Sequence, residues 1–402
     1  ISLYAGGIRL AALWHGKARL WSEGRRNIFE RMEAAVRPSD RIVWVHAASL
    51  GEFEQARPII ERLRAEHPEY KILLTFFSPS GYEIRKNYEG ADYVFYLPAD
   101  TPSNARRFLD IVHPEIAIFI KYEFWINLLS ELRRQKVRSY IVSAIFRRNS
   151  VFFRPYGAMW RQALETFDTL FVQNVESKRL LSEIGFDNVV VAGDTRFDRV
   201  AQIAAAAQRV ETIERFRGGG RLFVAGSTWG PDEEILLPLV NAHPDVKFVI
   251  APHEMDEGRI AHLMRDAKGG AVRYTQCDAA TRFDDVQVLV LDTMGMLSSV
   301  YGSATWAYVG GGFGVGIHNT LEAATFGLPI AFGPNYGKFK EARDMVSLGC
   351  AVSVRTAGEL AAWFAPLRDD EETLRRASRT AKDYTARNQG ATGIILRSIF
   401  NS

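Results

Sequence analysis

The chain has 402 residues, 47% of them hydrophobic and 24% charged, and this balance excludes an intrinsically disordered protein. Its length exceeds that of one ordinary domain, so we expect two packed domains. A net charge of only +3 argues against a general nucleic-acid or polyanion binder.

The N-terminal residues 1–14 are apolar, but they are too few for a helix that crosses a bilayer, which takes ~20 residues. No cleavage site of the signal-peptide type follows them. Cationic and aromatic side chains are interspersed at this end of the chain: Trp14, Lys17, Arg19, Trp21, Arg25 and Arg26. The pattern suits a membrane headgroup boundary, and it equally suits a helix packed on the core of its own domain. Both interpretations stay open.

From residue 41 onward, short β-branched or aromatic runs alternate with helical patterns such as 52–66 and 123–136. This alternation predicts βαβ units, and hence a parallel sheet covered by helices on both faces. The predicted strands of this first sheet are 42–47, 71–77, 93–97, 115–120, 139–144, 169–173 and 188–193.

A second series of strands follows an alanine-rich stretch at 201–210 and the glycines at 218–220, where we expect the linker. Two doubly wound, Rossmann-like domains in series imply a cleft between them, with ligands at the carboxyl ends of the strands. Residues 371–399 read as helix and are expected to pack back across the first domain. The predicted strands of the second sheet are 221–226, 246–251, 286–291, 306–311, 328–332 and 350–354.

The first motif at a strand end is SLGE (49–52), directly after strand 42–47. Small residues allow a tight turn there and the start of a helix, with the Glu52 carboxylate near the helix N-terminus and facing the cleft. Position alone favours a plain capping role for this glutamate.

The second motif is the glycine-rich segment 310–322, GGGFGVGIHNTLE, which follows a strand and opens a helix at about His318. Glycines let the main chain approach a ligand, and a helix N-terminus offers free N–H groups to a phosphate. Glu322, one turn into that helix, is placed to accept hydrogen bonds from sugar hydroxyls. The spacing does not match the dinucleotide fingerprint G-x-G-x-x-G.

The third motif is DTMG (292–295), in which Asp292 or Thr293 could cap a helix or present backbone groups to a base or phosphate. We expect no metal cofactor, because Asp284 and Asp285 lack a matching acid. Cys277 and Cys350 also lack metal-ligand spacing, and they fit free thiols better than a disulfide.

The ordered set of motifs resembles the Kdo (3-deoxy-D-manno-octulosonic acid) transferase family over nearly the whole chain. The matching segments are SLGE (49–52), YEFWIN (122–127), DTMG (292–295), GGFGVGIHNTLEAA (311–324) and NQGA (388–391). The resemblance implies a GT-B-type α/β fold and an inverting transfer of Kdo from CMP-Kdo to a lipid A precursor (lipid IVA) in lipopolysaccharide biosynthesis. It also implies an enzyme at the cytoplasmic face of the bacterial inner membrane that needs no cofactor.

The resemblance assigns the role of general base to Glu52. It places CMP on Met294, Gly295 and Met296 and on Asn319, Thr320, Leu321 and Glu322. The domains it implies are a membrane-associating segment at 1–35, an acceptor domain at 36–205, a CMP-sugar domain at 218–385 and a returning helix at 386–402.

Three positions depart from the family pattern. Where the family has P-R-H this chain has Pro252 and His253, so an arginine expected on the phosphate is missing and His253 or a lysine must replace it. Lys121 stands where the family has a carboxylate linked to catalysis, and Arg196 keeps the positive charge of a family lysine. Lys121 and Arg196 could clamp the donor as charge develops, or Arg196 could simply pair with Asp194 or Asp198.

Two other functions fit a GT-B chain: a nucleotide-sugar epimerase or other nucleotide-sugar transferase, and a nucleotide-binding module without catalysis. Glu52 as a base and a membrane-seeking N-terminus favour the transferase that acts on a lipid.

Overall fold

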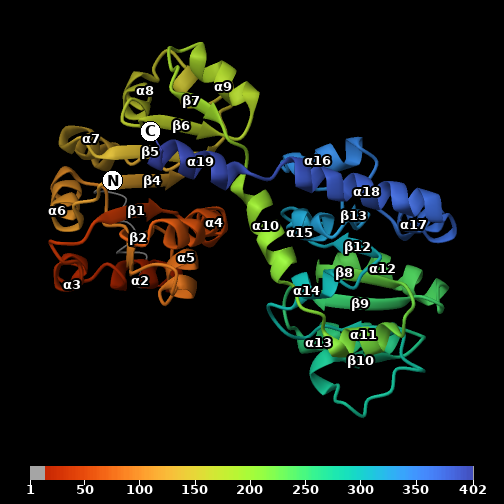
Figure 1. Cartoon of the computed structure of the whole chain (residues 1–402). Helices are drawn as coiled ribbons and strands as arrows, with labels where there is room; N and C mark the ends of the chain where they lie inside the picture. The colour runs from red at the N-terminus through yellow and green to blue at the C-terminus, as the bar shows by residue number, and fades with distance from the viewer. Residues whose placement is uncertain (1–13, 402) are drawn as a thin grey trace. The chain divides into compact units, whose positions relative to one another are not determined.

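The computed structural model describes residues 14–401 and divides the chain into two units. The first unit comprises residues 1–199 and 389–402, and the second comprises residues 200–388. Each unit is built on one seven-stranded sheet in which every strand pairing is parallel. The predicted α/β class with two Rossmann-like parallel sheets is therefore confirmed (Figure 1).

The first sheet has the strand order β3-β2-β1-β4-β5-β6-β7. Its strands are β1 (Ile42–His46), β2 (Lys71–Phe76), β3 (Tyr93–Tyr96), β4 (Ile116–Ile120), β5 (Arg138–Ala144), β6 (Thr169–Val172) and β7 (Val189–Val191). The helices of the first unit are α2 (Gly16–Glu23), α3 (Ile28–Ala35), α4 (Leu50–Glu66), α5 (Pro79–Arg85), α6 (Pro102–Val112), α7 (Ile126–Gln135), η1 (Val151–Phe153), α8 (Ala158–Leu164), α9 (Val175–Ser182) and α19 (Ala391–Phe400).

Both faces of this sheet are buried because successive residues of each strand point to opposite sides. On one face Trp44 packs with Phe108 and Phe119, and on the other Val43 and Val45 pack beneath α4. Helix α19, from the end of the chain, adds Ile395, Leu396 and Ile399 to the second of these clusters.

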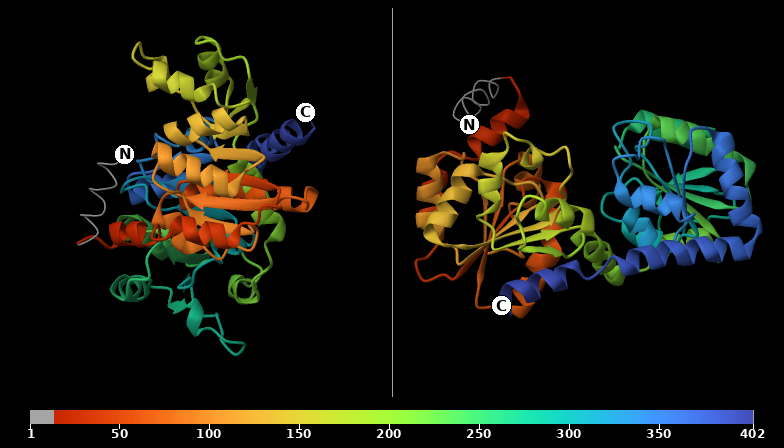
Figure 2. Two further views of the ribbon diagram at one scale, coloured as in Figure 1. Left: turned by 90° about the vertical axis from the view of Figure 1, so that its left-hand side faces the viewer. Right: turned by 90° about the horizontal axis from the view of Figure 1, so that it is seen from above.

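The second sheet has the order β10-β11-β9-β8-β12-β13-β14. Its strands are β8 (Leu222–Thr228), β9 (Lys247–Pro252), β10 (Ala271–Arg273), β11 (Val288–Val290), β12 (Trp306–Val309), β13 (Ile330–Phe332) and β14 (Ala351–Ser353). The helices of this unit are α11 (Glu211–Arg217), α12 (Gly230–Ala242), α13 (Glu257–Asp266), η2 (Tyr274–Gln276), α14 (Leu297–Tyr301), α15 (Thr320–Thr325), α16 (Lys340–Ser347), α17 (Ala357–Asp369) and α18 (Glu371–Arg387). Figure 2 shows α18 lying along this unit, where it packs against α15 and α17.

The linker predicted at residues 218–220 is wrong. Gly218 adopts a left-handed φ of 61° that ends α11, and this helix buries Ile213 and Phe216 in the core of the second unit. The units divide at residues 199 and 200 instead, inside α10 (Thr195–Ala206). A glycine run is therefore a helix C-cap here, which is another common use of glycine.

The helix predicted over 371–399 is two helices, α18 and α19. The break falls at Gly390, which has a φ of 104°. Gly390 N–H and Thr392 N–H both donate to the carboxylate of Asp198, at 2.6 and 2.7 Å. Asp198 thus caps the N-terminus of α19. This gives a structural reason for the NQGA segment and for Asp198.

Candidate functional site

Each sheet reverses its direction of growth beside its first strand, between β1 and β4 in the first unit and between β8 and β12 in the second. In open α/β sheets, ligands bind beyond the carboxyl ends of strands at such a switch point. Glu52 and Lys121 follow β1 and β4 at the first switch point, and residues 319–322 follow β12 at the second. The other candidates follow nearby strands: His253 comes after β9, residues 294–296 come after β11, and Arg196 lies in α10 after β7.

Glu52 lies in the first turn of α4, directly after β1. Ser49 caps this helix by accepting a hydrogen bond from Glu52 N–H at 3.5 Å, and Glu52 Oε2 accepts one from Ala48 N–H at 2.6 Å. The capping role suggested by position is therefore real. Burial and the nearby Glu123 carboxylate nevertheless raise the pKa of Glu52, against the lowering effects of Ala48 N–H, His46 and Lys121. A partly buried carboxylate with a raised pKa is suited to accept a proton.

Glu123, which the sequence did not single out, belongs to a buried polar network beside Glu52. Its Oε2 lies 2.7 Å from Trp125 Nε1 and 3.2 Å from Nε2 of the fully buried His46. On the far side of the imidazole, His46 Nδ1 lies 2.9 Å from Thr75 Oγ1, which also accepts from Trp44 Nε1 at 2.8 Å.

A histidine proton on Nε2 gives every group of this network a partner. His46 then donates to Glu123, while the Thr75 hydroxyl donates to Nδ1 and accepts from Trp44. The network fixes the Glu123 carboxylate at the carboxyl edge of the sheet. The E-x-W pair within YEFWIN was the sequence signal for it.

Lys121 follows β4 and has a φ of 60°. This left-handed conformation is unfavourable for residues other than glycine. Its N–H still donates to Val142 O on the neighbouring strand, at 2.9 Å. The positive charge of Lys121 acts on Glu52 and lowers its pKa, so the structure brings these two predicted residues together.

Arg196 forms the structural pair that the sequence allowed. Its Nε and backbone N–H donate to the two carboxylate oxygens of Asp194, at 2.8 and 2.9 Å. Gln55 Nε2 also donates to Asp194, at 2.8 Å. Burial acts to raise the pKa of Asp194, but the Arg196 charge and these hydrogen bonds hold it below its usual value. Asp198 does not share this pair, since it caps α19.

The glycine-rich loop of the second unit is held by the buried carboxylate of Asp232. One of its oxygens accepts from Gly311 N–H and Trp229 N–H, both at 2.9 Å, and the other accepts from Tyr308 Oη at 2.8 Å. Two glycines are required by close packing: a Cβ on Gly310 would lie 2.2 Å from Ser227 O, and one on Gly312 would lie 2.6 Å from Gly333. These two glycines are therefore needed for the packing of the loop, whether or not a ligand binds there.

Glu322 is held by Asn319, from its own loop, and by Ser298, which follows the predicted CMP residues 294–296. Asn319 caps α15 through Leu321 N–H at 3.1 Å, and its Nδ2 donates to Glu322 Oε1 at 2.9 Å. Ser298, just beyond residues 294–296, donates to Glu322 Oε2 at 2.7 Å. The helix begins at Thr320, two residues after the predicted start at His318.

The other predicted CMP residues differ in exposure. The side chains of Thr320 and Leu321 are buried, so these residues can offer a ligand only backbone groups. Met294 is 78% exposed, and Gly295 has a φ of 84°. The capping role considered for Asp292 or Thr293 is wrong: Met296 is the N-cap of α14, and the Asp292 carboxylate accepts from Thr275 N–H at 2.9 Å.

His253 follows β9 and its last residue, the buried Pro252. The exposed imidazole of His253 stacks on Trp229 and on His318, with ring centroids 4.8 and 4.3 Å apart. Trp229 Nε1 donates to His318 Nε2 at 3.2 Å. Burial, with a contribution from His253, lowers the pKa of His318 to about 4, so His318 is neutral at physiological pH. Three neighbouring strands thus present a stack of nitrogen heterocycles.

The N-terminal segment contains one exposed and one buried part. Residues 1–13 lie outside the described residues. Trp14 is 79% exposed, and Lys17 and Arg19 are also exposed. Trp21 is buried, so it belongs to the core of the unit, as the second interpretation holds for this residue.

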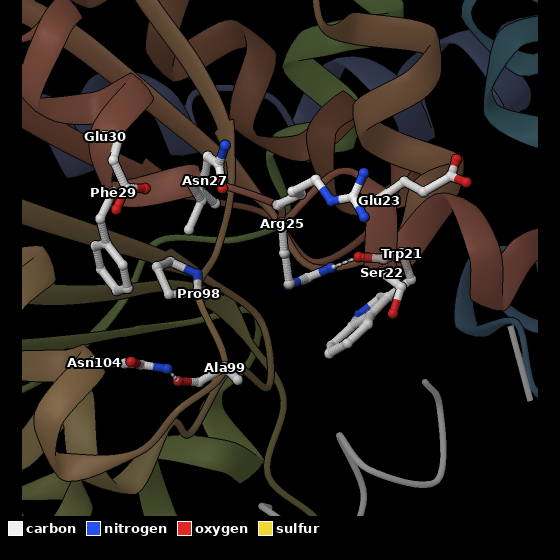
Figure 3. A pocket seen from close by; sticks show the side chains of 12 residues that line it. Trp21, Ser22, Glu23, Arg25, Asn27, Phe29, Glu30, Pro98, Ala99 and Asn104 are labelled. Atoms are coloured by element: carbon white, nitrogen blue, oxygen red, sulfur yellow. Dashed lines mark hydrogen bonds between the residues drawn. The ribbon is translucent and has the colours of Figure 1, made fainter. Parts of the chain in front are cut away.

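Arg25 is also part of the fold. Its guanidinium donates to the carbonyls of Trp21, Phe77 and Leu97, at 3.1, 2.8 and 2.8 Å, and lies 3.9 Å from the Trp21 ring centroid. Figure 3 shows this arginine in the wall of a cavity of about 540 Å³ between the α2–α3 turn and residues 98–104. Trp21 therefore belongs to the core, and the partly buried guanidinium of Arg25 is held by backbone carbonyls and by the Trp21 ring.

Within residues 14–401, no group of three or more His, Cys, Asp or Glu side chains is arranged to hold a metal ion, and no helix is both long and apolar enough to cross a bilayer. Cys277 and Cys350 are both free thiols.

The fold of both units has known counterparts. UDP-GlcNAc 2-epimerase from Neisseria meningitidis superposes with a TM-score of 0.64 at 16% identity, over 90% of this chain and 100% of the other. MurG from Acinetobacter baumannii gives a TM-score of 0.55 at 13% identity, over 90% and 100% of the two chains. At these identities the likeness concerns the fold alone, and the architecture is of the GT-B type.

Sequence comparison finds similarity to one family. The family model for 3-deoxy-D-manno-octulosonic-acid transferase (kdotransferase) matches residues 25–199. The 3-deoxy-D-manno-octulosonic acid transferase of Bordetella pertussis is 28% identical over 373 residues, which cover 89% of this chain and 86% of that protein. That of Haemophilus influenzae is 25% identical over 378 residues, covering the same 89% and 86%. The chain is thus similar to the 3-deoxy-D-manno-octulosonic acid transferase family over most of its length, and it is a glycosyltransferase.

Proposed function

We propose that the protein is an inverting transferase that moves Kdo from CMP-Kdo to a lipid A precursor of the lipid IVA type, in lipopolysaccharide biosynthesis. The observation that carries the proposal is Glu52, a carboxylate at the switch point of the first sheet whose pKa burial and Glu123 raise. The likeness to the family supports Kdo as the transferred sugar. The position and the raised pKa of Glu52 support this residue as the base.

In the proposed reaction, Glu52 accepts the proton of the acceptor hydroxyl while that oxygen forms a bond to the anomeric carbon of Kdo. The bond between this carbon and the phosphate oxygen breaks on the opposite face, and CMP leaves with its electron pair. Displacement from the opposite face inverts the anomeric centre. A base with a raised pKa takes the proton more readily in the transition state.

Lys121 is proposed to stabilise negative charge on the reacting groups, since its own charge already acts on Glu52. Arg196 is proposed to act mainly through Asp194, because its guanidinium is held against that buried carboxylate. The side chain of Arg196 is still 30% exposed, so its charge can add positive potential at the carboxyl edge of the first sheet.

The proposed donor site is the carboxyl edge of the second sheet. Glu322, oriented by Ser298 and Asn319, would accept hydrogen bonds from the ribose hydroxyls. Residues 294–296 and 319–321 would offer backbone groups, and His253 beside Pro252 would replace the missing arginine at the phosphate.

Incubating the protein with CMP-Kdo and a tetraacylated lipid A precursor, and then weighing the lipid, tests this function. We expect the lipid mass to increase by that of Kdo, with release of CMP. UDP-GlcNAc offered alone is the control for the epimerase activity of the structural neighbour. Epimerised UDP-GlcNAc with unmodified lipid would contradict the proposal.

Association with the cytoplasmic face of the inner membrane is part of the proposal. Transfer of an acyl chain from a bilayer to water costs ~0.8 kcal/mol per CH₂. We therefore expect an enzyme that acts on a lipid to bind at the membrane surface. We propose that Lys17, Arg19 and Arg26 form the charged part of the membrane-facing surface, because the Arg25 guanidinium donates to backbone carbonyls instead. Each such cation is worth ~1 kcal/mol near anionic headgroups.

Vesicle sedimentation measures this association. The full chain should pellet with anionic vesicles at low salt, and both deletion of residues 1–14 and the variant K17Q/R19Q should weaken pelleting, the latter only at low salt. Arg62→Gln, which removes an exposed arginine of α4 that pairs with Glu66, is the matched control. Equal pelleting of all proteins would show that the N-terminal segment does not dock.

A further inference from the structure

The loop that leaves β5 is built on a buried aromatic base. Phe152, in η1, is 6% exposed, and its ring centroid lies 4.8 Å from that of Phe124 and 5.3 Å from that of Phe146. Arg161 Nη1 donates to the carbonyls of Phe152 and Arg154, each at 3.0 Å. The backbone also closes tightly at Gly157, where a Cβ would lie 2.1 Å from Val151 O. This loop is therefore held by packing and by hydrogen bonds.

The solvent side of the same loop presents apolar and cationic side chains together. Tyr156 is 77% exposed, and Met159, at the start of α8, is 54% exposed. Arg147 and Arg154, on the same loop as Tyr156, are also exposed. In the described part of the chain neither arginine has a carboxylate partner, whereas the adjacent Arg148 pairs with Glu183 at 2.9 Å. We call these four residues, Arg147, Arg154, Tyr156 and Met159, the β5 platform.

The β5 platform lies at the same edge of the sheet as Glu52. Strand β5 neighbours β4, and the residues after β4 include Lys121 and Tyr122. Tyr122 is 46% exposed and lies within electrostatic reach of both Arg147 and Glu52. An acceptor whose hydroxyl reaches Glu52 can therefore extend over Tyr122 towards the platform.

We propose that the β5 platform binds the acceptor, with Arg147 and Arg154 on a phosphate of its headgroup and Tyr156 and Met159 against its acyl chains. This inference rests on the proposed lipid acceptor and names the surface of the first unit that recognises it. Two arginines without carboxylate partners carry uncompensated positive charge, which matches a phosphorylated glycolipid, and arginine binds phosphate in a bidentate manner. Exposed tyrosine and methionine beside them add apolar contact with little loss of hydrogen bonding.

The test compares acceptors in detergent, where no bilayer is present. Initial rates with saturating CMP-Kdo are measured for a phosphorylated acceptor and for the same acceptor after removal of its phosphates. The variants are R147Q/R154Q and Y156S/M159S. The matched controls are Arg148→Gln, an exposed arginine with a carboxylate partner, and Ile84→Ser, an apolar side chain 58% exposed on α5.

We expect R147Q/R154Q to raise KM for the phosphorylated acceptor about tenfold or more, with kcat and CMP affinity unchanged. The dephosphorylated acceptor should not distinguish this variant from the wild type. Y156S/M159S should raise KM for both acceptors, and neither control should change it.

An unchanged KM in R147Q/R154Q while the wild type transfers Kdo would overturn the β5 platform and leave the proposed function standing. Loss of binding to acceptor-free anionic vesicles, with KM in detergent unchanged, would assign these side chains to the bilayer surface and also overturn the inference. A wild type that transfers no Kdo to either acceptor would overturn the proposed function itself.

Discussion

The carboxyl edges of the two sheets place a glutamate in the same local setting and surround it differently. Glu52 and Glu322 both lie in the first turn of a helix that follows a strand beside the switch point. Glu52 accepts one backbone hydrogen bond and has the like charge of Glu123 nearby, which together with burial raises its pKa. Glu322 has a hydrogen-bond donor on each oxygen, from Asn319 and Ser298.

This difference suits the two glutamates to different functions. A carboxylate that burial and a like charge disfavour as an anion gains free energy by taking up a proton. A carboxylate whose oxygens are both held by neutral donors keeps its position, and this suits the recognition of hydroxyl groups. We therefore propose that the first edge carries out proton transfer and that the second holds the donor.

The strongest effect is expected at Glu52. Glu52→Gln keeps the size of the side chain and an acceptor for Ala48 N–H, but it removes the base, so turnover should fall by ~10²-fold or more. CMP affinity, measured by calorimetry on the same protein, should stay near that of the wild type. Near-normal turnover would show that Glu52 is not the base, and the proposed difference in function between the two edges would then be wrong.

Glu322→Ala should weaken CMP binding by ~1.5–3 kcal/mol, the usual cost of losing hydrogen bonds to a charged acceptor. Part of that loss comes from Asn319, which loses the partner that orients its amide. Glu371→Ala, at the start of α18 where the side chain pairs with Arg221, is the control. If calorimetry gives the same affinity for both variants and the wild type, the nucleotide binds elsewhere.

A smaller effect is expected from Glu123→Gln, which tests the raised pKa of Glu52. The base acts when ionised, so a raised pKa places the acid limb of the kcat/KM profile at higher pH. Removing the Glu123 charge should lower the pKa of Glu52 and move that limb to lower pH. Ala48 N–H, His46 and Lys121, which also act on Glu52, are retained in this variant.

Glu54→Gln is the control for that profile, since Glu54 pairs with Arg85 and Arg199 and is not among the main causes of the shift of Glu52. A limb that moves to higher pH, or equally in both variants, would show that Glu123 does not set the pKa of the base.

The sequence was sufficient to predict strand positions, and strand ends locate the site because ligands of α/β sheets gather there. This rule drew attention to Glu52 and Glu322, but position alone favoured a capping role for Glu52, and its proposed role as the base came from the resemblance to the family. The short edge strand β10 was missed, since its three residues, Ala-Val-Arg, do not form an apolar run.

The contacts that decide the chemistry were not predictable from the sequence. Glu123 meets His46 across 77 positions of the chain, and no local pattern reports such a pair. Arg25 looked like a membrane-facing cation, but the carbonyls that bind it belong to residues as far away as Leu97. The glycines at 218–220 permit a linker and a helix end equally, and only the burial of α11 distinguishes the two.

A double-mutant cycle of Glu52→Gln and Glu322→Ala tests the division of labour most directly. Turnover at saturating CMP-Kdo and CMP affinity are measured for the wild type, both single variants and the double variant. We predict that the turnover loss follows Glu52→Gln alone, that the affinity loss follows Glu322→Ala alone, and that the free energies add to within about 0.5 kcal/mol. A coupling well above that value, or a turnover loss in Glu322→Ala as large as that in Glu52→Gln, would contradict separate roles for the two edges.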